Sequence, residues 1–545
     1  MTPVRNREGT GIGRSSCGGV AVPTTVAEQV RRAQRCFSAD PALLTAEGWI
    51  SFGQLADLAD AAAHLMADEG ARFGDRIVLY FENGAELRVL EHAVLGNGLV
   101  RVALSPRLHP REVAEIVLDS NASLVCCSPG VAPAVREALA EAGASARVLP
   151  FSNAGSGENS LAVLASRPRS TALEWPSVSP ADIAMLIYSS GTTGTPKAAV
   201  VTHGAWVAQT SLAMRQLPEI GRGDVVLAVA PMTHFGGSIG LDCAMSGAAT
   251  VPVAAFEPHS VLSAIDEYGV TVLPLAPIML TRLVEALDAG ARRPPPIRAI
   301  PYGGSPVPPG TLAAAVGYFP GALVQYYGLA EALAPIACLT AGDHDALLGS
   351  GSHGHPLRHR LESAGRVVDG VQVRLVGRQI LVRGETVMVG YWNRDTLNAE
   401  VLNADGWLST GDIARIDDDG YLYLIDRAQD VIISGGFNIY PAEVERVIAA
   451  VPGLREAVVF GIPHERWGEG VCAAVVMEVV ADPRFAGDGE LLRTVVDFCR
   501  TRLASYKKPL VVLAVDEIPR NAAGKIDRRK LRSTLFPMFN ASVRT

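Results

Sequence analysis

Short apolar runs alternate with helical patterns over most of the first 430 residues. The apolar runs lie at 75–80, 99–104, 124–127, 225–230, 270–275 and 299–301. Runs of this length are typical of buried strands, and strands that alternate with helices form βαβ units. The pattern predicts an α/β fold in which a large N-terminal domain contains mostly parallel sheets and helices.

The pattern changes near residue 427. A helical pattern opens with Pro441 and runs over 441–450, a short strand follows at 457–461, and a basic segment lies at 525–532. These features predict a small, mobile α+β domain at the C-terminus. We expect a disordered leader at 1–25, the N-terminal domain at 26–428, the C-terminal domain at 429–533 and a tail at 534–545. A Gly-, Ser- and Pro-containing stretch at 152–179 predicts a linker between subdomains.

Charge and hydropathy exclude some classes of partner. The chain has 545 residues and a formal net charge of -8, and it contains no run of basic residues interleaved with aromatic ones. These features argue against a nucleic-acid partner. The N-terminus lacks the apolar core of a signal peptide, and no stretch approaches 18 uninterrupted apolar residues. We therefore expect a cytoplasmic protein with no membrane span.

The decapeptide 188–197 reads Tyr-Ser-Ser-Gly-Thr-Thr-Gly-Thr-Pro-Lys. Its glycines let backbone N–H groups close on a phosphate, its hydroxyls can donate to phosphate oxygens, and its lysine adds a cation. It is not a Walker A loop, because Thr195 and Pro196 precede Lys197. The alternative is a flexible linker. The candidate phosphate ligands are Ser189, Ser190, Gly191, Thr192, Thr193, Gly194 and Lys197.

Further motifs follow downstream. They are Pro231-Met232-Thr233-His234, Gly303-Gly304-Ser305-Pro306, Gln325-Tyr326-Tyr327-Gly328-Leu329-Ala330-Glu331, Ser409-Thr410-Gly411-Asp412, Asp426-Arg427, Gly435-Gly436-Phe437-Asn438-Ile439-Tyr440-Pro441-Ala442-Glu443 and Pro519-Arg520-Asn521-Ala522-Ala523-Gly524-Lys525. With the decapeptide, they resemble the adenylate-forming superfamily of acyl- and aryl-CoA ligases, luciferases and peptide-synthetase adenylation domains, from about residue 28 to residue 532. The resemblance implies that ATP activates a carboxylic acid as an acyl-adenylate, that pyrophosphate leaves, and that the acyl group passes to coenzyme A.

The resemblance assigns roles to individual residues. It implies that Thr192, Thr193 and Lys197 hold the β- and γ-phosphates and that Glu331 binds Mg²⁺, a hard cation that prefers oxygen ligands. Lys525 resembles the family's catalytic lysine, which stabilises the charge that develops between carboxylate and α-phosphate. A reading in which the fold only senses nucleotide would require this lysine to be lost.

The resemblance also assigns the nucleoside site. Tyr327 stacks on adenine, Asp412 accepts hydrogen bonds from the ribose hydroxyls, and Arg427 reaches ribose or phosphate. The remaining ATP-binding candidates are Gly303, Gly304, Ser305, Tyr326 and Gly328.

The acid pocket is assigned less fully. His234 borders it as either a gate or a general base, so we count it as a catalytic candidate, and Phe235 and Gly304 line the pocket. Phe235 stands where aryl-acid enzymes for siderophores typically carry Asn, which argues against a dihydroxybenzoate recognised in that manner. Arg101 and Arg107 either pair with an acidic substituent or are solvated surface residues.

The acceptor follows from the C-terminal motifs. Gly435 and Gly436 resemble the backbone that lines the pantetheine tunnel, so coenzyme A is the expected thiol. A carrier protein is the second possibility, although we expect no carrier domain after residue 532. The third is an amine or another nucleophile in a natural-product pathway, including nitrite activation for arylamine diazotisation. The expected cofactors are ATP, Mg²⁺ and coenzyme A, and the expected partner is a small-molecule acid.

Three features depart from the pattern or lie outside it. Ala330 replaces a threonine that normally contacts the α-phosphate, and Gln429 occupies the hinge position where family members carry Asp or Lys. Both mildly favour a specialised role. A histidine-rich stretch with His344, His353 and His355 could ligate a transition metal, but glycines and serines at 349–352 favour a surface loop.

Overall fold

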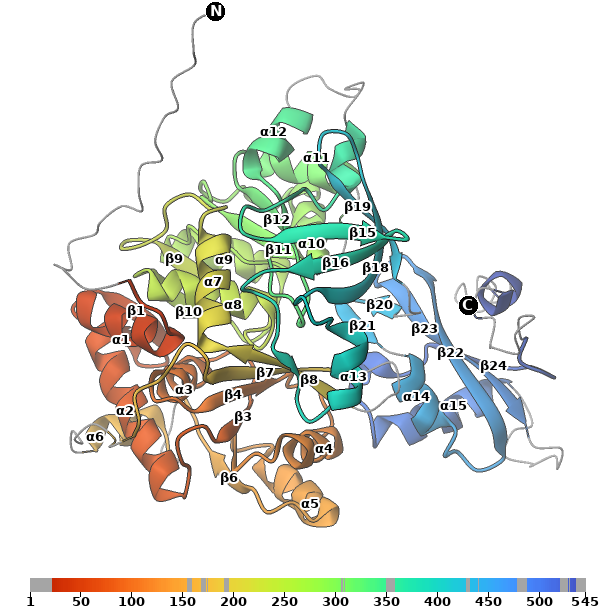
Figure 1. Cartoon of the computed structure of the whole chain (residues 1–545), viewed down its shortest axis with the longest axis horizontal. Helices are drawn as coiled ribbons and strands as arrows, with labels where there is room; N and C mark the ends of the chain where they lie inside the picture. The colour runs from red at the N-terminus through yellow and green to blue at the C-terminus, as the bar shows by residue number, and fades with distance from the viewer. Residues whose placement is uncertain are drawn as a thin grey trace, which may run out of the picture.

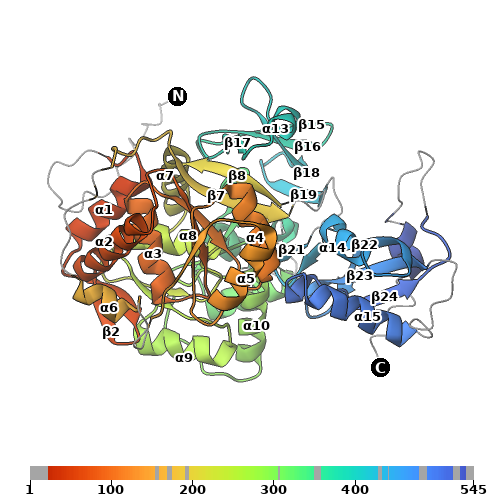
Figure 2. The same cartoon turned by 90° about the horizontal axis from the view of Figure 1, so that it is seen from below.

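The computed structural model describes residues 22–153, 159–167, 173, 175–190, 196–304, 307, 309–348, 358–427, 432–439, 441–477, 488–519, 528 and 530–535. A large N-terminal domain and a smaller C-terminal domain lie next to each other (Figure 1). Figure 2 shows the C-terminal elements beyond residue 440 on one side of the larger domain, beside its helices α4 and α5. Within the described ranges, no helix has both the length and the apolar character needed to cross a membrane.

Local capping signals start several of the helices. The Thr25 hydroxyl accepts from the Glu28 amide at the start of α1, and Pro110 opens α4 after the capping residue His109. The helices are α1 (Val26–Cys36), α2 (Phe52–Asp68), α3 (Ala85–Gly96), α4 (Pro110–Ser120), α5 (Ala132–Ala142), α6 (Leu161–Ser166), α7 (His203–Met214), α8 (Phe235–Met245), α9 (Pro258–Tyr268), α10 (Pro277–Asp288), α11 (Pro309–Tyr318), α12 (Ala341–Leu348), α13 (Asp395–Val401), α14 (Pro441–Ile448) and α15 (Asp488–Arg500). Since α6 lies within 152–179, the prediction of a plain linker there was incomplete.

A seven-stranded sheet in the order β17-β8-β7-β4-β3-β5-β6 carries the phosphate loop. Its strands are β3 (Arg76–Tyr80), β4 (Val100–Leu104), β5 (Leu124–Cys127), β6 (Arg147–Pro150), β7 (Ile183–Ser190), β8 (Pro196–Thr202) and β17 (Gly390–Tyr391). The five strands β6, β5, β3, β4 and β7 are neighbours in this order, and each pair of neighbours is parallel. At the other edge, β8 pairs antiparallel with β7, and β17 pairs antiparallel with β8.

Both faces of this sheet are buried. Ile77 and Leu79 pack in the cluster that contains residues of α2 and α3. Val78 and Val102 pack in the cluster that contains residues of α4 and α5. Successive side chains of a strand point to opposite faces, so a strand covered on both sides must be apolar throughout. This explains the continuous apolar runs in the sequence.

Two further sheets of the N-terminal domain combine parallel and antiparallel pairs. One contains β1 (Pro41–Thr45), β2 (Gly48–Ser51), β9 (Val225–Ala228) and β10 (Ala249–Pro252), and the other contains β11 (Ile300–Gly303), β12 (Leu323–Tyr327), β13 (Ala337–Leu339) and β14 (Arg366–Val367). The strand predicted at 270–275 is reduced to isolated bridges, in which Val272 pairs with both Val226 and Ala299.

The last two sheets are mainly antiparallel. One contains β15 (Gln372–Val376), β16 (Gln379–Arg383), β18 (Leu408–Ile416) and β19 (Leu422–Arg427), and the C-terminal sheet contains β20 (Ile432–Ser434), β21 (Phe437–Ile439), β22 (Leu454–His464), β23 (Gly468–Met477) and β24 (Val511–Ala514). The helix predicted at 441–450 is α14, and the strand predicted at 457–461 lies inside β22. The fold is thus the predicted α/β architecture with a small α+β domain.

Candidate active site

Lys197 and Glu331 lie together, although they are 134 positions apart in the sequence. The Lys197 ammonium is 3.6 Å from the Glu331 carboxylate. Both contact the Tyr391 hydroxyl, which accepts from Lys197 Nζ at 2.5 Å and donates to Glu331 Oε1 at 2.7 Å. Burial lowers the pKa of Lys197, and the nearby Glu331 charge partly restores it. The site therefore contains one cation and one carboxylate fixed by a shared hydroxyl.

Sequence reasoning missed Tyr391. It lies on β17, a strand of two residues that pairs with β8, so that Tyr391 is opposite Ala199. A strand this short leaves no periodic signal, and its partner strand is far away in the sequence. The pairing explains why the ring also lies 4.0 Å from Lys197 Nζ.

The predicted phosphate loop is described only at its two ends. Ser189 ends up opposite Lys197 in the β7–β8 pair, and its buried hydroxyl has no hydrogen-bond partner in the described part of the chain. Ser190 belongs to β7, but its side chain is not described. Gly191, Thr192, Thr193 and Gly194 lie outside the described residues, as do Ser305, Gln429 and Lys525.

Tyr327 and Asp412 form the predicted nucleoside end of the site. The Tyr327 hydroxyl donates to Asp412 Oδ2 at 2.6 Å, and both residues are buried. Asp412 follows Gly411, whose φ of +77° suits glycine, and it is paired across β18 and β19 with Arg427. Only the backbone of Arg427 is described.

Tyr326 faces the other way. Its hydroxyl donates to the Ala213 carbonyl at 2.7 Å. The centre of its ring lies 5.7 Å from the centre of the Phe235 ring, in an edge-to-face arrangement. Because adjacent strand residues point to opposite sides, Tyr326 and Tyr327 cannot both present their side chains to one nucleotide. The side chain of Tyr326 therefore belongs to the core, and the assignment of this residue to the ATP site remains a prediction.

The glycines near the site have different reasons for lacking a side chain. A Cβ on Gly303 would lie 2.5 Å from the Tyr326 carbonyl oxygen and 3.7 Å from Phe235, whereas one on Gly304 would meet nothing within 4 Å. Gly303 is thus required by close packing, and Gly304, at φ +97°, adjoins open space. A Cβ on Gly328 would lie 2.5 Å from Ala334 Cα, which is a packing requirement.

His234 stands where the two domains meet. Its ring lies 6.4 Å from the Phe437 ring in an edge-on arrangement, and its Nδ1 is 2.7 Å from the Thr233 hydroxyl. The residue is exposed to solvent, and desolvation by the protein around the ring, followed by the charges of Arg101 and Arg107, lowers the pKa of its imidazole. His234 is therefore neutral at physiological pH.

The two arginines weighed from the sequence differ in burial. Arg101 is buried and pairs with Glu91 at 2.7 Å, and it also donates to the Met232 carbonyl at 3.1 Å. The solvated alternative was wrong for Arg101, because α3 supplies a buried carboxylate. Its contact with Met232 fixes the backbone two residues before His234. Arg107 is exposed, with its guanidinium 4.7 Å from the Phe437 ring.

The glycine loop of the C-terminal domain faces the N-terminal domain. Gly435 and Gly436 have φ values of +57° and +82°, and a Cβ on Gly436 would lie 3.8 Å from Ala276 Cβ. Phe437 follows, and it stacks on Tyr506 at 4.3 Å. The predicted coenzyme A loop thus lies beside the predicted acid pocket.

The histidine-rich stretch has a structural role where it is described. His344 is buried, and its ring nitrogens lie 2.7 Å from the Tyr302 hydroxyl and 2.8 Å from the Thr340 carbonyl. His353 and His355 lie outside the described residues. The described part of the chain contains no group of three or more His, Cys, Asp or Glu side chains able to hold a metal.

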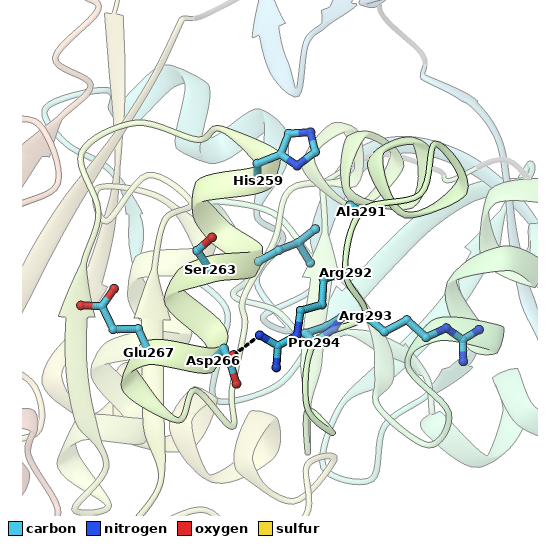
Figure 3. Close-up of a pocket in the computed structure, with 9 residues that line it drawn as sticks. His259, Ser263, Asp266, Glu267, Ala291, Arg292, Arg293 and Pro294 are labelled. Carbon is cyan, nitrogen blue, oxygen red and sulfur yellow. Dashed lines mark ion pairs between the residues drawn. The ribbon is translucent and has the colours of Figure 1, made fainter.

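A surface pocket of about 440 Å³ lies elsewhere, between α9 and residues 291–294. Figure 3 shows Arg292 reaching Asp266 across it, at 2.9 Å. Among the residues that the structure describes, no candidate site residue lines this pocket.

Known proteins resemble this chain in sequence and in fold. The family model described as AMP-binding enzyme matches residues 30–392, and the AMP-binding enzyme C-terminal domain matches residues 443–525. The chain is 33% identical over 500 residues to the long-chain-fatty-acid–CoA ligase FadD13 of Mycobacterium tuberculosis, covering 91% of this chain and 94% of the relative. It is 32% identical over 496 residues to a 2-succinylbenzoate–CoA ligase of Bacillus cereus, covering 90% and 94%. Among solved structures, the amide bond synthetase McbA from Marinactinospora thermotolerans has a TM-score of 0.78 and 30% identity, covering 93% of this chain and 99% of that chain.

Proposed function

Because this chain belongs to the AMP-binding enzyme family and is an adenylate-forming ligase, we propose that it joins a small carboxylic acid to the thiol of coenzyme A. The reaction has two steps. In the first, a carboxylate oxygen attacks the α-phosphorus of ATP and pyrophosphate leaves. In the second, the thiol attacks the acyl carbon and AMP leaves.

The N-terminal domain supplies several of the residues proposed for the first step. Attack of one anion on another requires fixed positive charge, and Lys197 provides it beside the phosphate loop. Glu331 fits a magnesium site, because its carboxylate is partly exposed and held in place by Tyr391. When bound, Mg²⁺ would neutralise charge on the phosphate oxygens. Asp412 and Tyr327 would orient the nucleoside.

The single observation that carries the thiol proposal is the position of the glycine loop. Gly436 approaches Ala276, while Phe437 approaches His234. A loop without side chains permits close approach of a slender chain such as pantetheine. The neutral imidazole of His234 could accept a hydrogen bond from the thiol or shield the adenylate from water.

Pyrophosphate exchange tests the first step. Purified protein is supplied with ATP, Mg²⁺ and a panel of aliphatic, aromatic and inorganic acids, and label is followed from pyrophosphate into ATP. We expect exchange only with suitable acids. Folded protein that binds ATP but exchanges with none of them would argue strongly against acid activation as the reaction.

Acceptor choice is then tested with the accepted acid. The structural similarity to an amide bond synthetase supports an amine as the second candidate acceptor. Coenzyme A, a phosphopantetheine-loaded carrier protein and a primary amine are offered separately, and thioester or amide is measured by mass spectrometry. Thioester with coenzyme A supports the proposal, and amide formation alone would replace coenzyme A by an amine.

A further inference from the structure

A buried ion bridge joins the two domains. Lys507 ends the short 3-10 turn Ser505–Lys507 of the C-terminal domain. Its ammonium is 2.6 Å from Glu112 Oε1 on α4 and 2.5 Å from Glu443 Oε1 on α14. All three side chains are less than 10% exposed. The Lys507 ammonium therefore forms ion pairs with two carboxylates, one from each domain.

The two halves of this bridge differ in what they connect. Glu443 and Lys507 belong to the same domain, so their contact does not depend on how the domains are oriented. Glu112 belongs to the N-terminal domain, so its contact with Lys507 exists only in an orientation like the one described. Glu112 also has a local role, because its Oε2 accepts from the His109 amide at the start of α4.

The bridge is connected to the glycine loop by direct packing. Tyr506 precedes Lys507 and stacks on Phe437 at 4.3 Å, and the guanidinium of Arg107 lies over Phe437 at 4.7 Å. Phe437 in turn meets the edge of His234. An ion pair that fixes Lys507 against α4 thus fixes the loop beside the acid pocket.

A neighbouring interdomain pair provides a contrast. Arg446 lies 3.6 Å from Glu115, one turn after Glu112 on α4, but both side chains are about half exposed. Exposed pairs contribute little, whereas a buried hydrogen bond between charged groups is among the stronger polar contacts. Loss of the Glu112 charge leaves Lys507 paired to Glu443 within its own domain, so the contact that is lost is the one between the domains. The orientation should therefore depend on Glu112 far more than on Glu115.

We propose that Glu112 is a positioning residue for the transfer step: through Lys507 it holds the C-terminal domain so that the Gly435–Gly436 loop faces the acid pocket. This inference rests on the proposed function, because it assigns the described orientation to acyl transfer. The residues placed in the first step within the N-terminal domain, including Lys197 and Glu331, do not touch this bridge. Loss of the Glu112 charge should therefore affect the two steps unequally.

The test compares Glu112→Gln with the matched control Glu115→Gln on the same helix. Glutamine can still accept from the His109 amide, so the helix cap is kept. Pyrophosphate exchange and transfer from a preformed acyl-adenylate to coenzyme A are measured separately, with thermal unfolding as a check on folding. We expect Glu112→Gln to exchange within about twofold of wild type but to transfer at least about tenfold more slowly, and Glu115→Gln to match wild type in both. Equal losses in the two steps, or unchanged transfer, would overturn the proposal.

A second measurement does not depend on activity. Glu115→Cys and Arg446→Cys are introduced together, and the yield of a short bismaleimide cross-link between the domains is recorded. Adding Glu112→Gln should lower the yield severalfold, and an unchanged yield would contradict the positioning role. If the wild-type enzyme transfers nothing to coenzyme A, the proposed acceptor fails, while the cross-link yield still decides whether Glu112 holds the domain.

Discussion

The hydroxyl of Tyr391 joins the two charged side chains to which we assign the phosphates and Mg²⁺. It accepts from Lys197 and donates to Glu331, so it orients a cation and a carboxylate with one atom. Without it, both side chains would keep more rotamers, and their placement would have to be fixed by the bound substrates. Precise placement of charge thus depends here on a neutral residue.

Replacing Tyr391 with Phe tests this role. The ring and its contact with Lys197 remain, while both hydrogen bonds to charged groups are lost. Each such bond contributes about 1.5–3 kcal/mol, so we expect kcat/KM for adenylate formation to fall about 10- to 100-fold. Pyrophosphate exchange at varied ATP measures the effect. Tyr423→Phe, which removes a hydroxyl bonded to Asp417 outside the site, is the control.

Ala330 allows a gain of function to be tested. The family resemblance implies a threonine at this position, with a hydroxyl that contacts the α-phosphate, and Ala330 itself packs partly buried against the core. If the missing donor limits the first step, Ala330→Thr should raise exchange by up to about 10- to 100-fold. ATP affinity should stay within a few-fold. A lower rate would indicate that the small residue makes room for the acid.

His92 gives the fold a predictable acid sensitivity. It is 1% exposed, and burial followed by the charges of Arg88 and Arg31 lowers its pKa to about 3. In the unfolded chain its pKa is about 6.5. Between these values only the unfolded state binds the proton, so the free energy of unfolding falls as the pH drops from about 6.5 to about 3.

The corresponding measurement is urea unfolding at pH 7 and pH 5. The His92 contribution over that interval is about 2 kcal/mol. His92→Gln, which does not titrate, should therefore lose about that much less stability than wild type on acidification. Equal losses in the two proteins would show that His92 titrates normally.

At the scale of elements, the sequence predicted strands that are continuous apolar runs, but it did not predict contacts between segments that are distant in the chain. The strands at 76–80 and 124–127 were found because they are buried on both faces and so wholly apolar. β17 was missed because two residues carry no period, and Arg101 was misjudged because its partner lies on a different element. Tyr326 and Tyr327 are neighbours in one sequence motif, but their side chains point to opposite faces of the strand.

The glycine loop between β20 and β21 supports a prediction of its own. Gly436→Leu would place a side chain toward Ala276, where the thiol is expected to approach. Transfer to coenzyme A should be strongly reduced while pyrophosphate exchange persists. Gly420→Leu is the control for backbone strain, since Gly420 has the same φ of +82° and a Cβ there would meet nothing within 4 Å. Similar transfer losses in both variants would attribute the effect to strain.

At the scale of the whole molecule, we expect the C-terminal domain to use a different face in each of the two steps. We expect Lys525→Ala to lower adenylate formation by at least about 10²–10³, as loss of a preorganised charge does. Transfer from a preformed acyl-adenylate should remain near wild type, because the described orientation presents the glycine loop instead. Single-turnover assays of the two steps provide the measurement. Equal losses in both would argue against separate use of the two faces of the domain.

The two-domain architecture and the family could be predicted from the sequence, because both follow from patterns within contiguous segments. The bridge from Lys507 to Glu112 could not be predicted, since the two residues lie 395 positions apart and the sequence around each one suggests a purely local role. Glu112 fits a helix cap, and a lysine is usually a surface residue. The pair forms only because the two domains pack against each other and bring Lys507 next to Glu112.

The pairing of β8 with β17 also has a consequence during synthesis. Tyr391 follows Lys197 by 194 residues, and the ribosome adds about 5–20 residues per second. The lysine therefore emerges roughly 10–40 s before the tyrosine that orients it. Until then the β8 edge of the first sheet has unpaired backbone groups, which can pair with other chains. During this interval the β8 edge can pair with other chains, which is a route to aggregation before the Lys197–Tyr391 contact forms.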